Sequence, residues 1–102
     1  MNLQKTLLQE IEESKRWFDT QKVESTYKRD LAKRIELLKW VLENMKNPDI
    51  QICALIESKM NKIIDEINKK DSIIEQDPLD SEVRILDWIL YVVCSNVTKK
   101  VR

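Results

Sequence analysis

The chain has 102 residues, of which 42% are apolar and 35% charged, a composition typical of one soluble helical or globular domain. Its 18 acidic and 18 basic residues cancel at pH 7, so no overall field attracts it to nucleic acid or to a membrane. The absence of glycine and histidine excludes glycine-rich phosphate loops, most tight β-hairpins and histidine-based catalytic or zinc sites. We therefore expect a single all-α domain over residues 1–102, built as a four-helix antiparallel bundle.

The first predicted helix covers residues 3–18. Its apolar residues recur on one face at about 100° per residue, as in an amphipathic helix. They are Leu3, Leu7, Ile11 and Phe18. The boundary that follows, at residues 19–20, is weak, so a first and second helix that are nearly continuous form the alternative.

The second predicted helix covers residues 25–46 and ends at a strong break. Apolar residues recur along it at spacings of three and four, and Asn47-Pro48-Asp49 follows. Proline disfavours a helical conformation in the residue before it and is tolerated in the first turn of a helix. Asn47 is therefore the predicted N-cap of a third helix over residues 48–70.

The third and fourth predicted helices meet in an acidic stretch. Between Asp71 and Glu82 the chain has five acidic residues and no basic one, which is typical of a solvated connector. Ile73 and Ile74 keep the helical phase, so the third helix could extend to Gln76. Because residues 77–78 (Asp-Pro) repeat the cap-and-proline pattern, we expect the fourth helix over residues 78–98.

The fourth predicted helix carries more apolar surface than an outer helix of a bundle needs. Two adjacent apolar stripes cover well over half of its circumference, whereas an outer helix usually needs little more than a third. This helix is either the central element or is covered by another chain. The second stripe gives the candidate self-association residues of a homodimer: Ile85, Trp88, Ile89 and Val92.

The two cysteines, Cys53 and Cys94, both fall within apolar stripes. Two cysteines do not make the disulfide framework of a small secreted domain, and no zinc-binding spacing is present. We expect two buried free thiols that pack as small apolar side chains. The alternative is a redox switch, which would need an exposed thiol beside a basic group, a setting that neither cysteine shows in the sequence.

Candidate catalytic groups are few, and we predict no enzyme activity and no cofactor. Glu10 and Glu13 share a helix face and could belong to a metal-dependent site, but a solvated acidic face is the simpler interpretation. No residues are assigned to catalysis, to a cofactor or to a metal.

Trp40 is the leading candidate for contact with another protein. It lies on the face of the second helix opposite the apolar stripe, beside Arg29, Lys33 and Leu37. Tryptophan and arginine are enriched at the energetically dominant positions of protein interfaces. The alternative is that the ring covers a neighbouring helix or is half-exposed, as amphipathic rings often are.

We therefore expect a non-enzymatic helical interaction protein that acts as an adaptor, inhibitor or regulator by binding another protein. By analogy of size and composition it could come from a phage or mobile element and block host machinery. The alternative is a nucleic-acid-binding regulator that uses the basic residues of the second helix and of the tail at Lys99, Lys100 and Arg102. Acidic side chains interleave with the basic ones of the second helix, which favours an ordinary solvated face.

The expected location is the cytoplasm, without membrane attachment. Acidic residues interrupt the first 13 positions, where a signal peptide needs an unbroken apolar segment. The longest apolar run, from Trp88 to Cys94, has seven residues, far fewer than the roughly 20 that span a bilayer.

Overall fold

A computed structural model describes the backbone of residues 3–98 and the side chains of residues 3–94. In this part of the chain there are four α-helices and no strand: α1 (Leu3–Thr20), α2 (Thr26–Met45), α3 (Ile52–Lys69) and α4 (Ile73–Thr98). The all-α prediction with four helices is confirmed. Serine and threonine side chains form hydrogen bonds at the ends of these helices, and no described residue has a positive φ.

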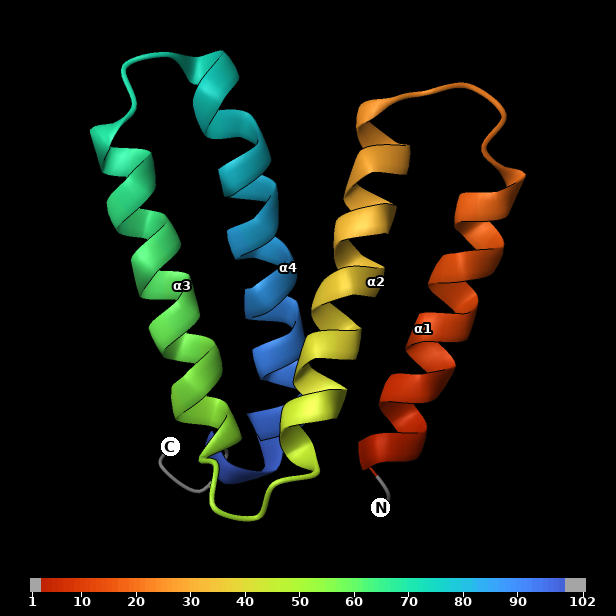
Figure 1. The fold of residues 1–102 in the computed structure, drawn as a ribbon, viewed down its shortest axis with the longest axis vertical. Coiled ribbons are helices and arrows are strands. Elements are labelled where there is room, and N and C mark those ends of the chain that lie inside the picture. Colours follow the sequence, from red (N-terminus) through yellow and green to blue (C-terminus); the bar gives the residue numbers. More distant parts are fainter. Residues whose placement is uncertain (1–2, 99–102) are drawn as a thin grey trace. The chain divides into compact units, whose positions relative to one another are not determined.

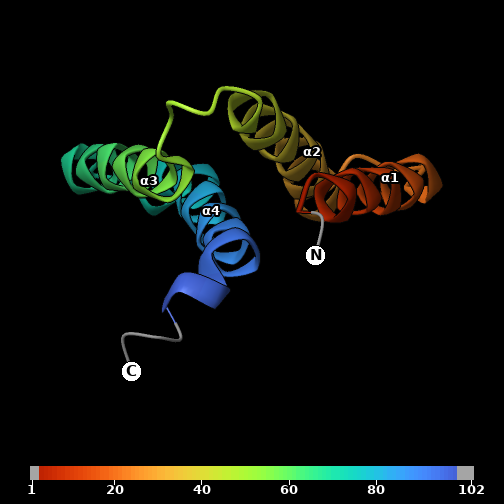
Figure 2. The same ribbon diagram turned by 90° about the horizontal axis from the view of Figure 1, so that it is seen from below.

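The helices pack as two antiparallel pairs, each of which is a compact unit (Figure 1). α1 and α2, joined by residues 21–25, form the first hairpin, and α3 and α4, joined by residues 70–72, form the second. Seen from below, the two helices of each pair again lie side by side (Figure 2). The antiparallel direction is therefore present in each hairpin, and the single domain over residues 1–102 stays a prediction.

A loop separates α1 from α2 in the first hairpin, so the alternative of a nearly continuous first and second helix is wrong. α1 continues two residues past the predicted end and stops at Thr20, whose hydroxyl donates to the carbonyl of Trp17 at 2.7 Å. Ser25 then adopts an extended backbone, and its hydroxyl accepts a hydrogen bond from the Lys28 N–H at 3.1 Å. Because this side chain caps the first turn of α2, the two helices are separate.

The central part of the predicted apolar faces of the first hairpin is buried, while Leu3 and Phe18 of the α1 face are half-buried. Leu7 and Ile11 of α1 and Leu31 and Leu38 of α2 are each at most 4% exposed. Burying a leucine or isoleucine side chain stabilises a fold by about 1.5–3 kcal/mol. Apolar burial along these faces is therefore the main source of the hairpin's stability.

The predicted start of the third helix at Pro48 is wrong. The Asn47 side chain accepts a hydrogen bond from the Asp49 N–H at 2.9 Å, and the Ile50 N–H donates to the Asn47 carbonyl at 3.2 Å. Asn47 therefore closes a turn instead of capping a helix. α3 begins at Ile52, after an N-cap residue, Gln51, whose side chain makes no capping bond.

The boundary between the third and fourth helices is also displaced from its prediction. α3 ends at Lys69 and α4 begins at Ile73, so neither the extension of α3 to Gln76 nor the start of α4 at residue 78 is correct. The hydroxyl of Ser72 accepts the N–H of Ile74 at 3.2 Å, which satisfies a donor in the first turn of α4. The side-chain amide of Gln76 donates to the Lys70 carbonyl at 3.0 Å and so supports the connecting loop.

As a result, Pro78 lies inside α4 instead of at its start. Proline has no N–H, so the carbonyl four residues earlier loses its usual helical donor. The cap at Ser72 sets the start of the helix, and the proline is tolerated within it.

A disulfide joins Cys53 of α3 to Cys94 of α4, with an S–S distance of 2.01 Å and a Cα–Cα distance of 6.2 Å. The expectation of two free thiols is therefore wrong. Each cysteine does occupy an apolar stripe, but the antiparallel pairing of α3 and α4 brings the beginning of one helix beside the later part of the other. Ile56, Ile63, Leu86 and Ile89 are also buried in the two helices of this hairpin.

Candidate interaction surfaces

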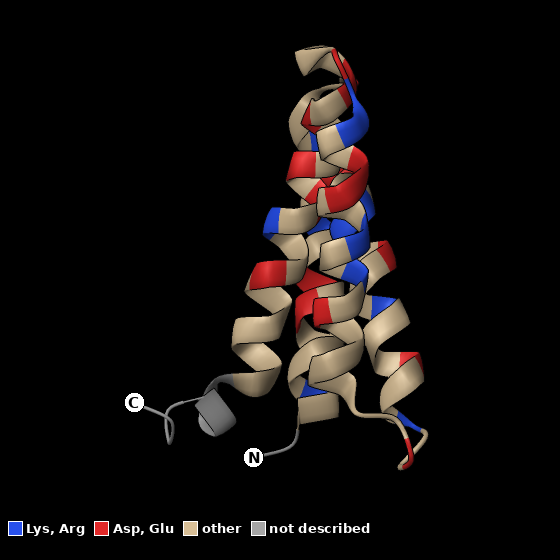
Figure 3. Ribbon diagram, turned by 90° about the vertical axis from the view of Figure 1, so that its left-hand side faces the viewer, with Lys and Arg blue, Asp and Glu red and all other residues tan. Residues whose placement is uncertain are grey.

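The predicted basic face of α2 carries paired charges. The Arg29 guanidinium lies 3.0 Å from the Asp30 carboxylate, and the Lys33 ammonium lies 3.1 Å from the Glu36 carboxylate. Basic and acidic residues also interleave along the helices (Figure 3). Local pairing of this kind reduces the positive potential that a phosphate backbone would meet.

Trp40 and Leu37, the apolar members of the predicted partner surface, differ in exposure. Leu37 is only 1% exposed, whereas Trp40 is half-buried. The backbone carbonyl of Trp40 accepts a hydrogen bond from the Asn44 side chain at 2.8 Å. The role of these residues in binding a partner stays a prediction.

The predicted self-association residues lie on α4 with mixed exposure. Ile89 is fully buried, while Ile85, Trp88 and Val92 are half-buried. The predicted homodimer stays a prediction. The basic residues of the tail, Lys99, Lys100 and Arg102, lie outside the described residues.

The acidic candidates on α1 have different surroundings. Glu10 contacts the Arg34 guanidinium at 3.5 Å across the first hairpin, with both side chains partly exposed. Glu13 lines an open hollow on α1 together with Arg16, Trp17 and Thr20. Among the described side chains, no group of three or more His, Cys, Asp or Glu is placed to hold a metal ion.

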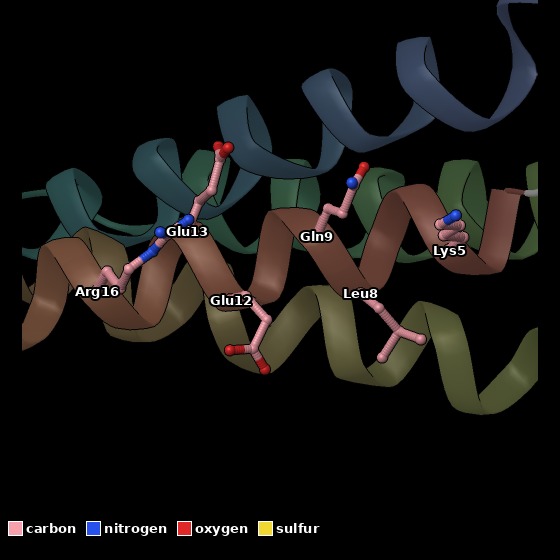
Figure 4. A pocket seen from close by; sticks show the side chains of 6 residues that line it. All are labelled: Lys5, Leu8, Gln9, Glu12, Glu13 and Arg16. Atoms are coloured by element: carbon pink, nitrogen blue, oxygen red, sulfur yellow. The ribbon is translucent and has the colours of Figure 1, made fainter.

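A second open hollow continues along α1 (Figure 4). Leu8 and Glu12 point to one side of it and Gln9 and Glu13 to the other. Its lining combines carboxylates, an amide, an ammonium and a guanidinium with one apolar side chain; the six residues are Lys5, Leu8, Gln9, Glu12, Glu13 and Arg16.

The loop end of the first hairpin has two exposed aromatic residues that were not predicted as a site. Trp17 is 57% exposed and Tyr27 is 50% exposed. The Glu10–Arg34 contact fixes the register of the two antiparallel helices. Trp17 follows Glu10 by seven residues and Tyr27 precedes Arg34 by seven, which is about two helical turns on each helix. Both rings therefore lie on the flank of the hairpin that carries the ion pair.

Further contacts fix this loop end. The Lys28 ammonium lies 4.8 Å from the centroid of the Phe18 ring and 3.1 Å from the Glu24 carboxylate. These contacts tie the end of α1 to the start of α2. Val23, in the connecting loop, is 75% exposed. We name Trp17, Val23 and Tyr27 the loop-end surface.

Neither Trp17 nor Tyr27 was predicted as a site residue from the sequence. Their proximity follows only from the antiparallel register, that is, from knowing that α1 packs against α2 and which residues face each other. The exposure of Tyr27 was not evident from the sequence either, because Tyr27 is in phase with the apolar stripe of α2. It nevertheless lies half-exposed in the first turn of that helix.

None of the described helices is both long enough and apolar enough to cross a membrane. No family model, curated protein or solved structure matches the chain.

Proposed function

We propose that the protein is a non-enzymatic helical module that binds another protein through the loop-end surface of its first hairpin. The observation that carries this proposal is the placement of two half-exposed aromatic residues, Trp17 and Tyr27, on the same flank. The proposal covers an adaptor, an inhibitor or a regulator, of phage type or otherwise, since each of these needs only a binding surface. We keep the predicted homodimer and the cytoplasmic location as parts of it.

Aromatic side chains are suited to this role because they bury a large area on binding and lose little conformational entropy. Residues that dominate a protein interface typically cost at least about 2 kcal/mol of binding free energy when truncated. The surroundings of Trp17 add a carboxylate, a guanidinium and a hydroxyl from Glu13, Arg16 and Thr20, which could supply polar contacts at the rim.

The nucleic-acid alternative has less support. Its candidate residues Arg29 and Lys33 each have a carboxylate within about 3 Å, at 3.0 and 3.1 Å. To neutralise phosphates, Arg29 and Lys33 would have to give up these ion pairs.

The proposal is tested by partner capture with matched variants. Immobilised protein is incubated with extract of the native host, and retained proteins are identified by mass spectrometry. Trp17→Ser and Tyr27→Ser should each lower the retention of a specific partner at least tenfold, with unchanged helicity, because both rings are already half-exposed.

Leu8→Ser is the matched control. Leu8 is 50% exposed and precedes Trp17 by nine residues, so at about 100° per residue it lies on the opposite flank of α1. Replacing Leu8 by serine should leave the capture of the partner unchanged. Capture that survives both aromatic substitutions but is lost with Trp40→Ser would place the partner on the α2 face instead. Retention abolished by nuclease treatment would favour the nucleic-acid alternative.

A further inference from the structure

The second hairpin is closed covalently at both ends. The chain itself joins α3 to α4 through residues 70–72, and the Cys53–Cys94 disulfide joins them at the far end. Cys53 is the second residue of α3, and the two cysteines are separated by 41 residues. The disulfide therefore encloses nearly all of α3 and most of α4.

A cross-link in this position acts mainly on the unfolded chain. Closing a loop of this length removes conformational entropy from the unfolded state, which shifts the folding equilibrium by a factor on the order of 10²–10³. A unit of two helices buries little apolar surface and depends on such a link more than a large domain does. The first hairpin has no cysteine, so its folding equilibrium has no such contribution.

We propose that the Cys53–Cys94 disulfide is a redox clasp, which small thiols open by attack at Cys53 and which controls the folding of the second hairpin alone. Disulfides in cytoplasmic proteins are usually transient or redox-sensing, so the proposed location agrees with this role. The inference does not depend on the loop-end surface, which lies on the other hairpin.

The two cysteine residues differ in exposure. Cys94 is 3% exposed, whereas Cys53 is only half-buried. Exchange requires a thiolate to approach one sulfur in line with the S–S bond, and access decides which one is attacked. Cys53 is therefore the point of entry.

The exchange has two steps. The thiolate of a glutathione-like molecule attacks the Cys53 sulfur, the S–S bond breaks, and Cys94 leaves as a thiolate that takes up a proton. A second thiolate attacks the sulfur of the bound small thiol, which releases Cys53 as a thiolate and forms the disulfide of the small thiol. Two electrons pass from two small thiols to the protein, and oxidation by that small disulfide reverses both steps.

Hydrogen exchange of the 102-residue chain, with and without reduced glutathione, tests the clasp. Reduction should raise the exchange rate of the most protected amides of α3 and α4 by about 10²–10³-fold, the factor expected for the lost cross-link. Amides of α1 and α2 should exchange at unchanged rates. Unchanged protection of α3 and α4 after complete reduction would overturn the proposal, and so would an equal loss in both hairpins.

A variant with both Cys53→Ser and Cys94→Ser supplies the matched control. It should exchange like the reduced protein under both conditions. Should its second hairpin not fold at all, the oxidised wild type compared with the reduced wild type still measures the clasp.

The point of entry is tested separately by brief exposure to glutathione, alkylation of the free thiols, and peptide mapping. Glutathione should be found on Cys53 and the alkyl group on Cys94. The reverse distribution would overturn the assignment of Cys53. Two alkylated cysteines before any reductant is added, in protein purified in air, would show that the disulfide does not form and would overturn the clasp.

Discussion

The two hairpins share one plan but are held together by different means. Across the first hairpin, α1 and α2 are linked by non-covalent contacts: Glu10 with Arg34 at 3.5 Å and Lys28 over the Phe18 ring at 4.8 Å. Across the second hairpin, the Cys53–Cys94 disulfide adds a covalent link to the buried apolar contacts and to the hydrogen bond that the Gln76 side chain donates to the Ile67 carbonyl at 3.4 Å. Partly exposed ion pairs contribute up to about 1 kcal/mol, whereas a disulfide over a long loop contributes about 2–4 kcal/mol. The comparison indicates that similar helical shapes can differ greatly in how they respond to salt and to reductants.

The helix starts differ between the hairpins as well. Ser25 caps α2 with its hydroxyl, and Ser72 does the same for α4. α3 begins at Ile52 after Gln51, whose side chain makes no capping bond, and α4 contains Pro78. Two of the less favourable local features thus lie in the second hairpin, the one that has the disulfide.

Truncation of a core residue has the largest expected effect and would show whether the hairpins unfold independently. Leu7 of α1 and Leu86 of α4 are both fully buried. Leu7→Ala and Leu86→Ala should each lower the free energy of unfolding by about 2–5 kcal/mol, from lost burial and the cavity left behind. Hydrogen exchange should accelerate only in the hairpin that carries the change. Equal acceleration in both hairpins would mean that the chain unfolds as one cooperative domain.

The two prolines should show effects of opposite sign. Pro78→Ala supplies an N–H inside α4 and should raise stability by up to about 3 kcal/mol, measured by urea unfolding of the oxidised protein. Pro48 lies in the turn between α2 and α3, where its ring restricts the unfolded chain. Pro48→Ala should therefore lower stability by about 0.4–1 kcal/mol. A loss of stability in Pro78→Ala would show that the proline is favourable where it stands.

The smallest effects are expected at the helix caps. Ser25→Ala removes the acceptor for the Lys28 N–H and should cost about 1 kcal/mol. Gln51→Asp places a capping carboxylate where the Gln51 side chain makes no capping bond, and should stabilise α3 by about 0.5–1 kcal/mol. Shifts of the urea midpoint measure both changes. If Gln51→Asp left the midpoint unchanged, the backbone at residue 51 would be unsuited to side-chain capping.

The fold was predictable where helical periodicity was strong and became less predictable at the boundaries. Leu7 and Ile11 of the predicted apolar face of α1 are buried as expected. Both proline signals were misassigned, because Asn47 uses its side chain within a turn and Ser72 caps α4 before the proline is reached. Competing local hydrogen bonds decided these boundaries, and residue types alone do not rank such bonds.

The candidate site was less predictable than the fold, because it depends on the pairing of residues distant in sequence. Trp17 and Tyr27 become one surface only when the register of α1 and α2 is fixed by Glu10 and Arg34. The same limitation applies to Cys53 and Cys94, which sequence reasoning treated as two separate buried side chains. In both cases the register between adjacent antiparallel helices was the missing information.

The Cys53–Cys94 bond also changes what a protease can do to the chain. Any single cut between the two cysteines, including one in the 70–72 loop, leaves both fragments in one covalent molecule while the bond is intact. A cut in the 21–25 loop of the first hairpin separates α1 from the rest of the chain covalently, and only packing then retains it. After one cut in an oxidising medium, the second hairpin therefore stays one covalent molecule, whereas the fragments of the first are held together by packing alone.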